Sequence, residues 1–133
     1  MNRSLSSPAQ LLGRLLMAVI FILGGWGKFN GHEAAVGYIA KNGIPMPEVA
    51  YWVSVAVELL GGLAILVGLQ TRAVSLAMAI FCVATAVMVH YHPEDRGQMT
   101  NFLKNLCMAG GFLQLYAVGA GGWSLDSLFS RRS

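Results

Sequence analysis

The chain has 133 residues, of which 56% are hydrophobic and only 11% are charged, and its formal net charge is +3. Ordinary soluble domains carry about 25% charged residues, so a soluble fold of this length could not bury so much apolar surface. A single domain over residues 1–133 in a lipid bilayer is therefore expected, and the lack of a large Lys/Arg cluster argues against nucleic acid as a partner.

Four apolar stretches are each about 20 residues long, which is the length that a helix needs to cross a bilayer. They cover residues 9–29, 48–69, 71–91 and 101–119. The first ends in GGWGKFNGHE, which offers no small-residue cleavage site, so we expect it to stay as a membrane anchor. The predicted fold class is an all-α membrane protein built as a four-transmembrane-helix bundle.

A short interfacial helix is predicted between spans one and two. Within residues 30–47, the string HEAAVGYIAKN places apolar side chains on one helical face: Ala34, Ala35, Tyr38 and Ile39. The dipeptide Asn42-Gly43 is typical of a helix end. We expect this helix to lie at the membrane interface and to cap one end of the bundle.

The links between the later spans predict their arrangement. Residues 70–72 are a very short connection, which requires spans two and three to form an antiparallel hairpin. Residues 92–100, HPEDRGQMT, are polar and predict a loop outside the bilayer. Four spans place both termini on one side, and the arginines of the short turn and the tail favour a cytoplasmic location for that side. Glycine pairs inside the spans predict close helix contacts.

Two charged residues interrupt the apolar stretches. Glu58 is the only charge between Val49 and Leu69, and Arg14 interrupts the first span in the same way. A charge at that depth costs roughly 2.5–3.5 kcal/mol on insertion scales. We therefore predict an Arg14–Glu58 ion pair, which either sets the helix register or tunes Glu58 as an acceptor of protons or ligand. A second pair, Arg72–Asp126, is predicted to tie the C-terminal tail to the turn after span two.

Several polar residues converge at the predicted outer mouth of the bundle. Glu58 and His90 are the candidate catalytic groups, because a histidine can relay a proton near neutral pH. The candidate cofactor-binding residues are Lys28, Lys104, Asn105 and Trp26. Cations, an imidazole and an amide around a carboxylate suit an anionic or quinone-like ligand. The alternative is that the lysines snorkel to the headgroups and Trp26 belongs to an aromatic belt.

Neither a metal nor a haem site is predicted. His90 and His92 could supply two ligands, but a metal needs three or four, and the remaining histidine is His32. No histidine lies in the middle of a span, which disfavours haem. Cys82 and Cys107 lie in apolar stretches without a CxxC spacing, and we expect both to be buried free thiols. The alternative is a disulfide, because the two residues lie on neighbouring predicted helices.

Taken together, the strings FILGGWGKF, VELLGGLAILVGLQTR, FLKNLCMAGGFLQL and GAGGWSLD resemble the DoxX family of small bacterial inner-membrane proteins. The resemblance implies a multi-pass four-helix bundle in the bacterial inner membrane. It also implies an association with redox chemistry, since the family is named after a subunit linked to a terminal quinol oxidase, and members are linked to thiosulfate:quinone oxidoreduction and to membrane oxidoreductase complexes. The family's polar pattern falls on Arg14, Lys28, Glu58, Arg72, His90, Lys104, Asn105 and Asp126.

Three functions stay open at this point. The chain could be a quinone-interacting redox subunit or accessory protein, which would need an oxidoreductase partner subunit to exchange electrons. It could bind or transport a small anionic or amphipathic molecule, in which case four spans are few and a homo-oligomer is expected. It could also be a membrane scaffold for an oxidoreductase complex, with purely structural polar pairs.

Overall fold

The computed structural model of the protein describes residues 3–132, with side chains from residue 6 onward. This part of the chain is all-helical and contains no strand. In chain order its elements are α1 (Arg3–Asn30), α2 (His32–Lys41), α3 (Pro47–Ala56), the π-helical turn η1 (Val57–Gly61), α4 (Gly62–Val67), α5 (Thr71–Thr85), the π-helical turn η2 (Ala86–His90), α6 (Arg96–Val118) and α7 (Leu125–Ser130).

Within the described residues, three helices are long and apolar enough to cross a membrane. They are Ser6–Asn30, Pro47–Val67 and Thr71–His90, which coincide with the first three predicted spans. The fourth predicted stretch falls on α6, which has 23 residues but a more polar composition. Each apolar stretch of the sequence is therefore helical, and three of the four are long and apolar enough to span a membrane.

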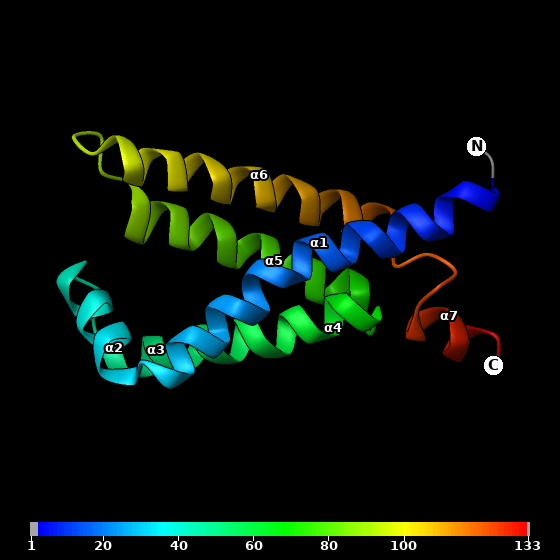
Figure 1. Ribbon diagram of the computed structural model, residues 1–133, viewed down its shortest axis with the longest axis horizontal. Helices are drawn as coiled ribbons and strands as arrows, with labels where there is room; N and C mark the ends of the chain where they lie inside the picture. Colours follow the sequence, from blue (N-terminus) through cyan, green and yellow to red (C-terminus); the bar gives the residue numbers. More distant parts are fainter. Residues whose placement is uncertain (1–2, 133) are drawn as a thin grey trace.

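The helices form two pairs that meet near the middle of the molecule. α5 and α6 run side by side and antiparallel, while α1 lies along α3 and α4 (Figure 1). The core lies where the pairs meet: the rings of Phe21 and Phe112 are 5.4 Å apart, and Ile65, Met78 and Cys82 are buried beside them. α2 lies at one end of the molecule, the α2 end, and α7 lies at the other, the α7 end.

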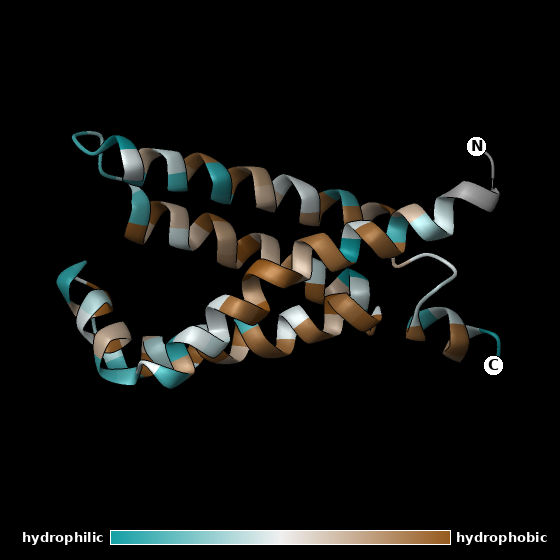
Figure 2. Cartoon of the chain, in the orientation of Figure 1, coloured by the Kyte–Doolittle hydropathy of each residue, from teal (hydrophilic) through white to brown (hydrophobic). Residues whose placement is uncertain are grey.

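The surface is apolar over most of its length. Hydrophobic residues run along the helices, and hydrophilic ones gather toward the ends (Figure 2). Large side chains such as Leu16, Leu23 and Leu60 are about two-thirds exposed. Soluble proteins rarely expose so much contiguous apolar surface, which is the arrangement expected of helices in lipid.

Glycines allow the helices to approach closely, as the sequence predicted. A Cβ atom on Gly25 would lie 2.8 Å from Cγ of Leu59 and 3.0 Å from Cβ of Glu58. A Cβ on Gly62 would lie 2.9 Å from the side chain of Ile22. The contact between α1 and the η1–α4 segment therefore requires glycine at both positions. Gly110, by contrast, has open space around it.

Arg14 connects three segments at the α7 end. Its Nη1 donates to the carbonyl oxygens of Ile65 at 3.2 Å and Leu66 at 2.9 Å, and its Nη2 donates to the carbonyl oxygen of Trp123. The last carbonyls of a helix lack partners within the helix, so a cation at the end of α4 is favourable. Gly68 ends α4 with a φ of 72°, and a Cβ there would clash with Ser124 and with Arg14.

The predicted Arg14–Glu58 pair is therefore wrong. The carbonyls that Arg14 binds lie seven and eight residues beyond Glu58, a distance of about 10 Å along a helix. The pairing required Arg14 and Glu58 to lie at the same level on neighbouring helices, and the sequence does not report the offset between two antiparallel helices.

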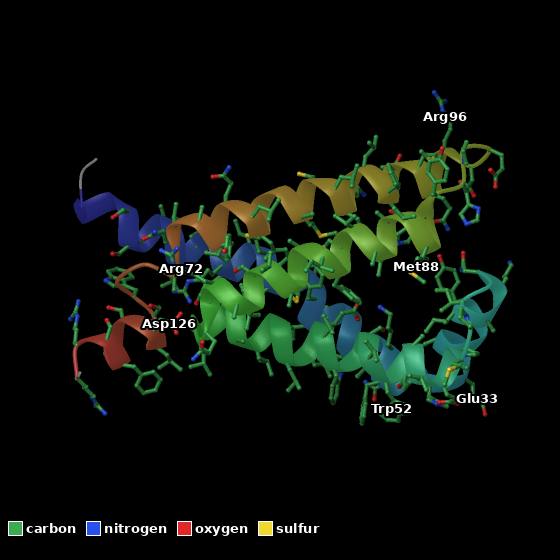
Figure 3. The ribbon with its side chains drawn as sticks, turned by 180° about the vertical axis from the view of Figure 1, so that it is seen from behind. Glu33, Trp52, Arg72, Met88, Arg96 and Asp126 are labelled. Carbon is green, nitrogen blue, oxygen red and sulfur yellow. The ribbon has the colours of Figure 1, made fainter. Side chains whose placement is uncertain are left out.

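The predicted Arg72–Asp126 pair is also wrong, although both residues lie at the α7 end (Figure 3). The carboxylate of Asp126 accepts hydrogen bonds from the backbone N–H groups of Gln70 at 2.7 Å and Thr71 at 2.9 Å. Arg72 instead donates to the carbonyl oxygen of Tyr116 at 3.2 Å. Asp126 thus ties the tail to this turn as expected, but it caps the start of α5 rather than pairing with a cation.

We predict that Gly25→Ala lowers the free energy of unfolding by about 1–3 kcal/mol, because the added methyl group overpacks the α1–η1 contact. Thermal unfolding in detergent measures the effect. Gly110→Ala is the matched control, since its methyl group enters open space and improves helix propensity by up to about 1 kcal/mol. Equal destabilisation by both substitutions would contradict this account of the contact.

The attachment of the tail is predicted to depend on pH. Although partial burial acts to raise the pKa of Asp126, hydrogen bonds from the backbone of Thr71 and Gln70, and the charge of Arg14, hold this pKa below its usual value. The folded state thus binds fewer protons, so its stabilisation is complete above the unfolded pKa of about 3.9 and is lost as pH falls through the folded pKa.

The protection of residues 120–130 against hydrogen exchange, measured relative to the intrinsic rate at each pH, should accordingly decrease in acid. Asp126→Asn should produce the same loss of protection at neutral pH. Arg72→Ala is the control that should leave this segment protected, because Arg72 binds Tyr116 rather than Asp126. Equal loss of protection in Arg72→Ala and in Asp126→Asn would instead restore the Arg72–Asp126 ion-pair prediction.

Candidate functional site

A partly buried ion pair joins α1 to the π-helical turn of the second span. Nζ of Lys28 lies 2.7 Å from Oε1 and 2.8 Å from Oε2 of Glu58. The side chain of Glu58 is 10% exposed and that of Lys28 is 35% exposed. Lys28 lies 14 residues after Arg14, about 21 Å along the same helix, so Lys28 takes the role that the sequence had suggested for Arg14.

Two π-helical turns lie on opposite sides of the same cavity. η1 contains Glu58, and η2 ends at His90. A π turn adds one residue to a helical turn, which changes the direction of the side chains around it and is frequent at functional sites. Both Glu58 and His90 line the cavity, together with Met88, which lies on the side of η2 that faces α2 and α3 (Figure 3).

The cavity has a volume of about 450 Å³ and lies between the two helix pairs toward the α2 end. Most of the side chains that line it are apolar. They come from every element from α1 to α6, both included, except α4. The polar side chains in the lining are Lys28, Tyr38, Ser54, Glu58, Thr85, His90 and Asn105. A mostly apolar cavity with a few converging polar groups is the usual form of a small-molecule site.

Four of the six predicted catalytic and cofactor-binding residues lie in this lining: Lys28, Glu58, His90 and Asn105. The other two do not line the cavity. Lys104 is exposed on α6, and Trp26 is 58% exposed and stacks on Phe29 with ring centroids 6.0 Å apart. On a helix, residues 104 and 105 point about 100° apart, so only one of these neighbours can face inward.

One polar contact and one unpaired hydroxyl in the lining were not predicted. Asn105 donates from Nδ2 to Oγ1 of Thr85 at 3.0 Å, and this hydroxyl donates in turn to the backbone of α5. Oγ of Ser54 is buried and has no hydrogen-bond partner among the described residues. A buried unpaired hydroxyl is costly, and a bound ligand would satisfy it.

A hydrogen-bond network at the α2 end links α2 to the α5–α6 connection. Nδ1 of His90 lies 2.7 Å from Oε1 of Gln98, whose Nε2 donates to the hydroxyl of Tyr38 at 3.4 Å. Nε2 of His92 lies 3.3 Å from Oδ1 of Asn42. Gln98 was not predicted as a site residue, although the string Asp-Arg-Gly-Gln is typical of a helix start and indicates that its side chain lies near this end of α6.

Within the described part of the chain, no group of three His, Cys, Asp or Glu side chains is placed to share a metal ion. Both cysteines are free thiols. Cys82 is buried as predicted, but Cys107 is exposed on α6, because α6 buries only the face that packs against α5 and α1.

Comparisons with known proteins agree with the membrane fold. The chain is 35% identical to the Inner membrane protein YqjF of Escherichia coli (strain K12) over 98% of each chain. It is 35% identical to the Inner membrane protein YphA of the same organism, covering 87% of this chain and 86% of the relative. It is also 32% identical to the "Putative oxidoreductase CatD" of Bacillus subtilis (strain 168), covering 67% of this chain and 64% of the relative. No solved structure matches.

The apolar spans and these relatives point to the same family of membrane proteins. The DoxX family model matches residues 9–91, which include two candidate spans, nearly all of a third and most of the cavity lining. The chain therefore belongs to the DoxX family of membrane proteins.

Proposed function

We propose that this protein is a redox-associated subunit of the bacterial inner membrane that binds a quinone head group in the cavity beside the Lys28–Glu58 pair. Its inner-membrane relatives support the location. The partly buried ion pair in the wall of a mostly apolar cavity is the observation that carries the proposal. Quinones combine a polar ring with an apolar tail, and this lining offers both environments.

The proposal includes a bundle of four spans, with α6 as the fourth. α6 has 23 residues, about 34 Å of helix, which is enough to cross the hydrocarbon core. It runs antiparallel along α5, a predicted span, for most of its length. In this arrangement α2 lies at the outer membrane interface, and the α7 end, which carries the start of α1 and the C-terminal tail, faces the cytoplasm.

The polar groups of the cavity suit a ligand that exchanges protons. Glu58 and His90 reach the cavity from different spans and can each accept a proton, while Lys28 holds the carboxylate in place. The chemistry that a bound quinone would supply is the transfer of electrons, which this chain would share with a partner subunit. The name of the Bacillus subtilis relative, which includes the word oxidoreductase, supports this direction.

A second function uses the same cavity without redox chemistry. Binding or transport of a small amphipathic molecule would need the same mixed lining, and Ser54 with its unpaired hydroxyl would bind such a ligand equally well. A scaffold function would need no ligand at all. These alternatives are outcomes of the experiment below.

The test is mass spectrometry of small molecules that co-purify with the protein in mild detergent. We expect wild-type protein to retain a quinone, and the double variant Lys28→Met/Glu58→Met to lose it. Both charges are removed together, because removal of Lys28 alone would leave the carboxylate of Glu58, which is 10% exposed, without its cation. Lys104→Ala is the control: it also removes a lysine charge, but outside the cavity, and it should retain the ligand.

Retention of a different lipid or anion would favour binding or transport. A folded wild-type protein that retains nothing, and that also fails to bind an added short-tailed benzoquinone, would favour the scaffold and contradict the proposal.

A further inference from the structure

α6 differs from the other spans in the side chains that it exposes. It lies at the edge of the molecule, packed against α5 (Figure 1). Within the described residues, the three other spans expose no charged, amide or hydroxyl side chain beyond their first and last turns. Large apolar side chains such as Leu16, Leu60 and Ile80 cover them instead. On α6 the amide of Gln114 and the thiol of Cys107 are exposed, so polar groups face the side where lipid is expected.

The exposed residues of α6 follow a regular spacing. Six of them recur at alternating intervals of three and four residues, and we call them the α6 seam: Thr100, Leu103, Cys107, Gly110, Gln114 and Ala117. At about 100° per residue they form one stripe, on the side of α6 opposite to the buried Phe112 and Leu115. This spacing is that of two helices that pack along each other at a crossing angle of about 20°.

The composition of the α6 seam suits contact with another helix inside the membrane. It extends over about 26 Å, which is most of the hydrocarbon core. Gly110 has open space around it, so the backbone of a second helix can approach closely there. The side chain of Gln114 makes no hydrogen bond with a described residue, and lipid tails offer neither a donor nor an acceptor to its amide. A covering helix would supply both.

The α6 seam is complementary to itself. Two copies inserted in one membrane have the same orientation, so a two-fold axis along the membrane normal places each seam residue against its own counterpart. A side-chain amide both donates and accepts, and Gln114 can therefore pair with Gln114 of a second copy. No seam residue is charged. Lys104 points about 100° away from Leu103, which keeps its charge off the axis.

We propose that the α6 seam is the interface of a parallel homodimer, in which α6 packs against α6 of a second copy of this chain. The inference rests on the four-span arrangement of the proposed function, because α6 must cross the membrane, but it does not depend on the ligand. Asn105 and Met108, which line the cavity, lie on the other side of α6, so each copy retains its own cavity.

The natural thiol of Cys107 makes the first test possible. Copper phenanthroline and air, applied to native membranes, oxidise two thiols to a disulfide when their Cα atoms lie within about 7 Å. We expect a linked product of twice the chain mass in wild type and its loss in Cys107→Ser. Cys82 is buried and should not contribute. Leu103→Cys, added to Cys107→Ser, should restore the product because it places a thiol elsewhere on the α6 seam.

Two matched controls place a thiol on other exposed surface in the Cys107→Ser background. Leu113→Cys lies on α6 but about 100° from Gln114, and Ile80→Cys lies on the outward side of α5. Neither should give the linked product. Linkage that is as strong at these positions as at Cys107 would indicate random collision and would overturn the inference. Linkage of Cys107 to a different protein would also overturn it.

Substitutions in the α6 seam should weaken association without unfolding the chain. Gly110→Leu fills the space needed by the second helix, and Gln114→Leu removes the amide pair. In each case we expect the dimer dissociation constant to rise about threefold to tenfold or more, measured by energy transfer between labelled copies in liposomes. Leu113→Ala, outside the seam, should leave it unchanged. Unaltered association in both seam variants would contradict the proposed interface.

A labelling experiment separates failure of the dimer from failure of the four-span arrangement. Arg96 begins α6, and Arg131 lies in the tail that follows it. In the Cys107→Ser background, a membrane-impermeant maleimide should label Arg96→Cys and Arg131→Cys from opposite sides of the membrane. Labelling from one side would overturn the fourth span and the dimer together. Labelling from opposite sides, with no linked product from Cys107, would overturn the dimer alone.

Discussion

The ion pair between Lys28 and Glu58 is the constraint on which the arrangement of the site depends. A carboxylate inside apolar helices needs a cation within hydrogen-bond distance, because the desolvation of a lone charge is not offset by lipid. That requirement brings α1 against η1, and the approach is close enough that Gly25 cannot carry a side chain. The cavity lies beside this contact, between α1 and α3 on one side and the α5–α6 pair on the other.

The two ends of the molecule are built in different ways. At the α7 end, Arg14, Gly68 and Asp126 join α1, α4, α5 and the tail through hydrogen bonds to backbone atoms. At the α2 end, the helix pairs are linked across the cavity by side-chain contacts such as those of Gln98 with Tyr38 and His92 with Asn42. Contacts with the backbone depend little on rotamers, whereas contacts between side chains are easily broken. The cavity thus lies at the end of the molecule where side-chain contacts link the helix pairs.

The sequence predicted where the helices lie, but it did not predict which charged side chains pair between them. Apolar length and the short link at residues 70–72 located the helices, and the glycines indicated where helices touch, because these features act over neighbouring residues. The partner of Glu58 depended instead on the offset between α1 and the second span. That offset follows from how Ile22, Leu59 and Gly62 pack, and no local pattern reports it.

For the site, the sequence predicted which residues gather at one end of the spans, but not which of their side chains face the cavity. Lys28, Glu58, His90 and Asn105 could be grouped because each is a polar residue near the same end of a span. The choice between Lys104 and Asn105 depended on the rotation of α6, and the involvement of Ser54 and Gln98 depended on side-chain geometry. The π turns were not visible in the sequence, because one added residue in a helix leaves the apolar pattern almost unchanged.

The contacts of Arg14 have a consequence for the biosynthesis of the chain. Its acceptor carbonyls come 51, 52 and 109 residues later in the sequence. During translation the first span thus reaches the translocon with a cation that has no partner, and the second span supplies only part of what it needs. The last partner, Trp123, is made 109 residues after Arg14. The N-terminal helix therefore completes its hydrogen bonding only when the C-terminal segment returns to it, so an incomplete chain carries an unsatisfied charge that membrane quality control can recognise.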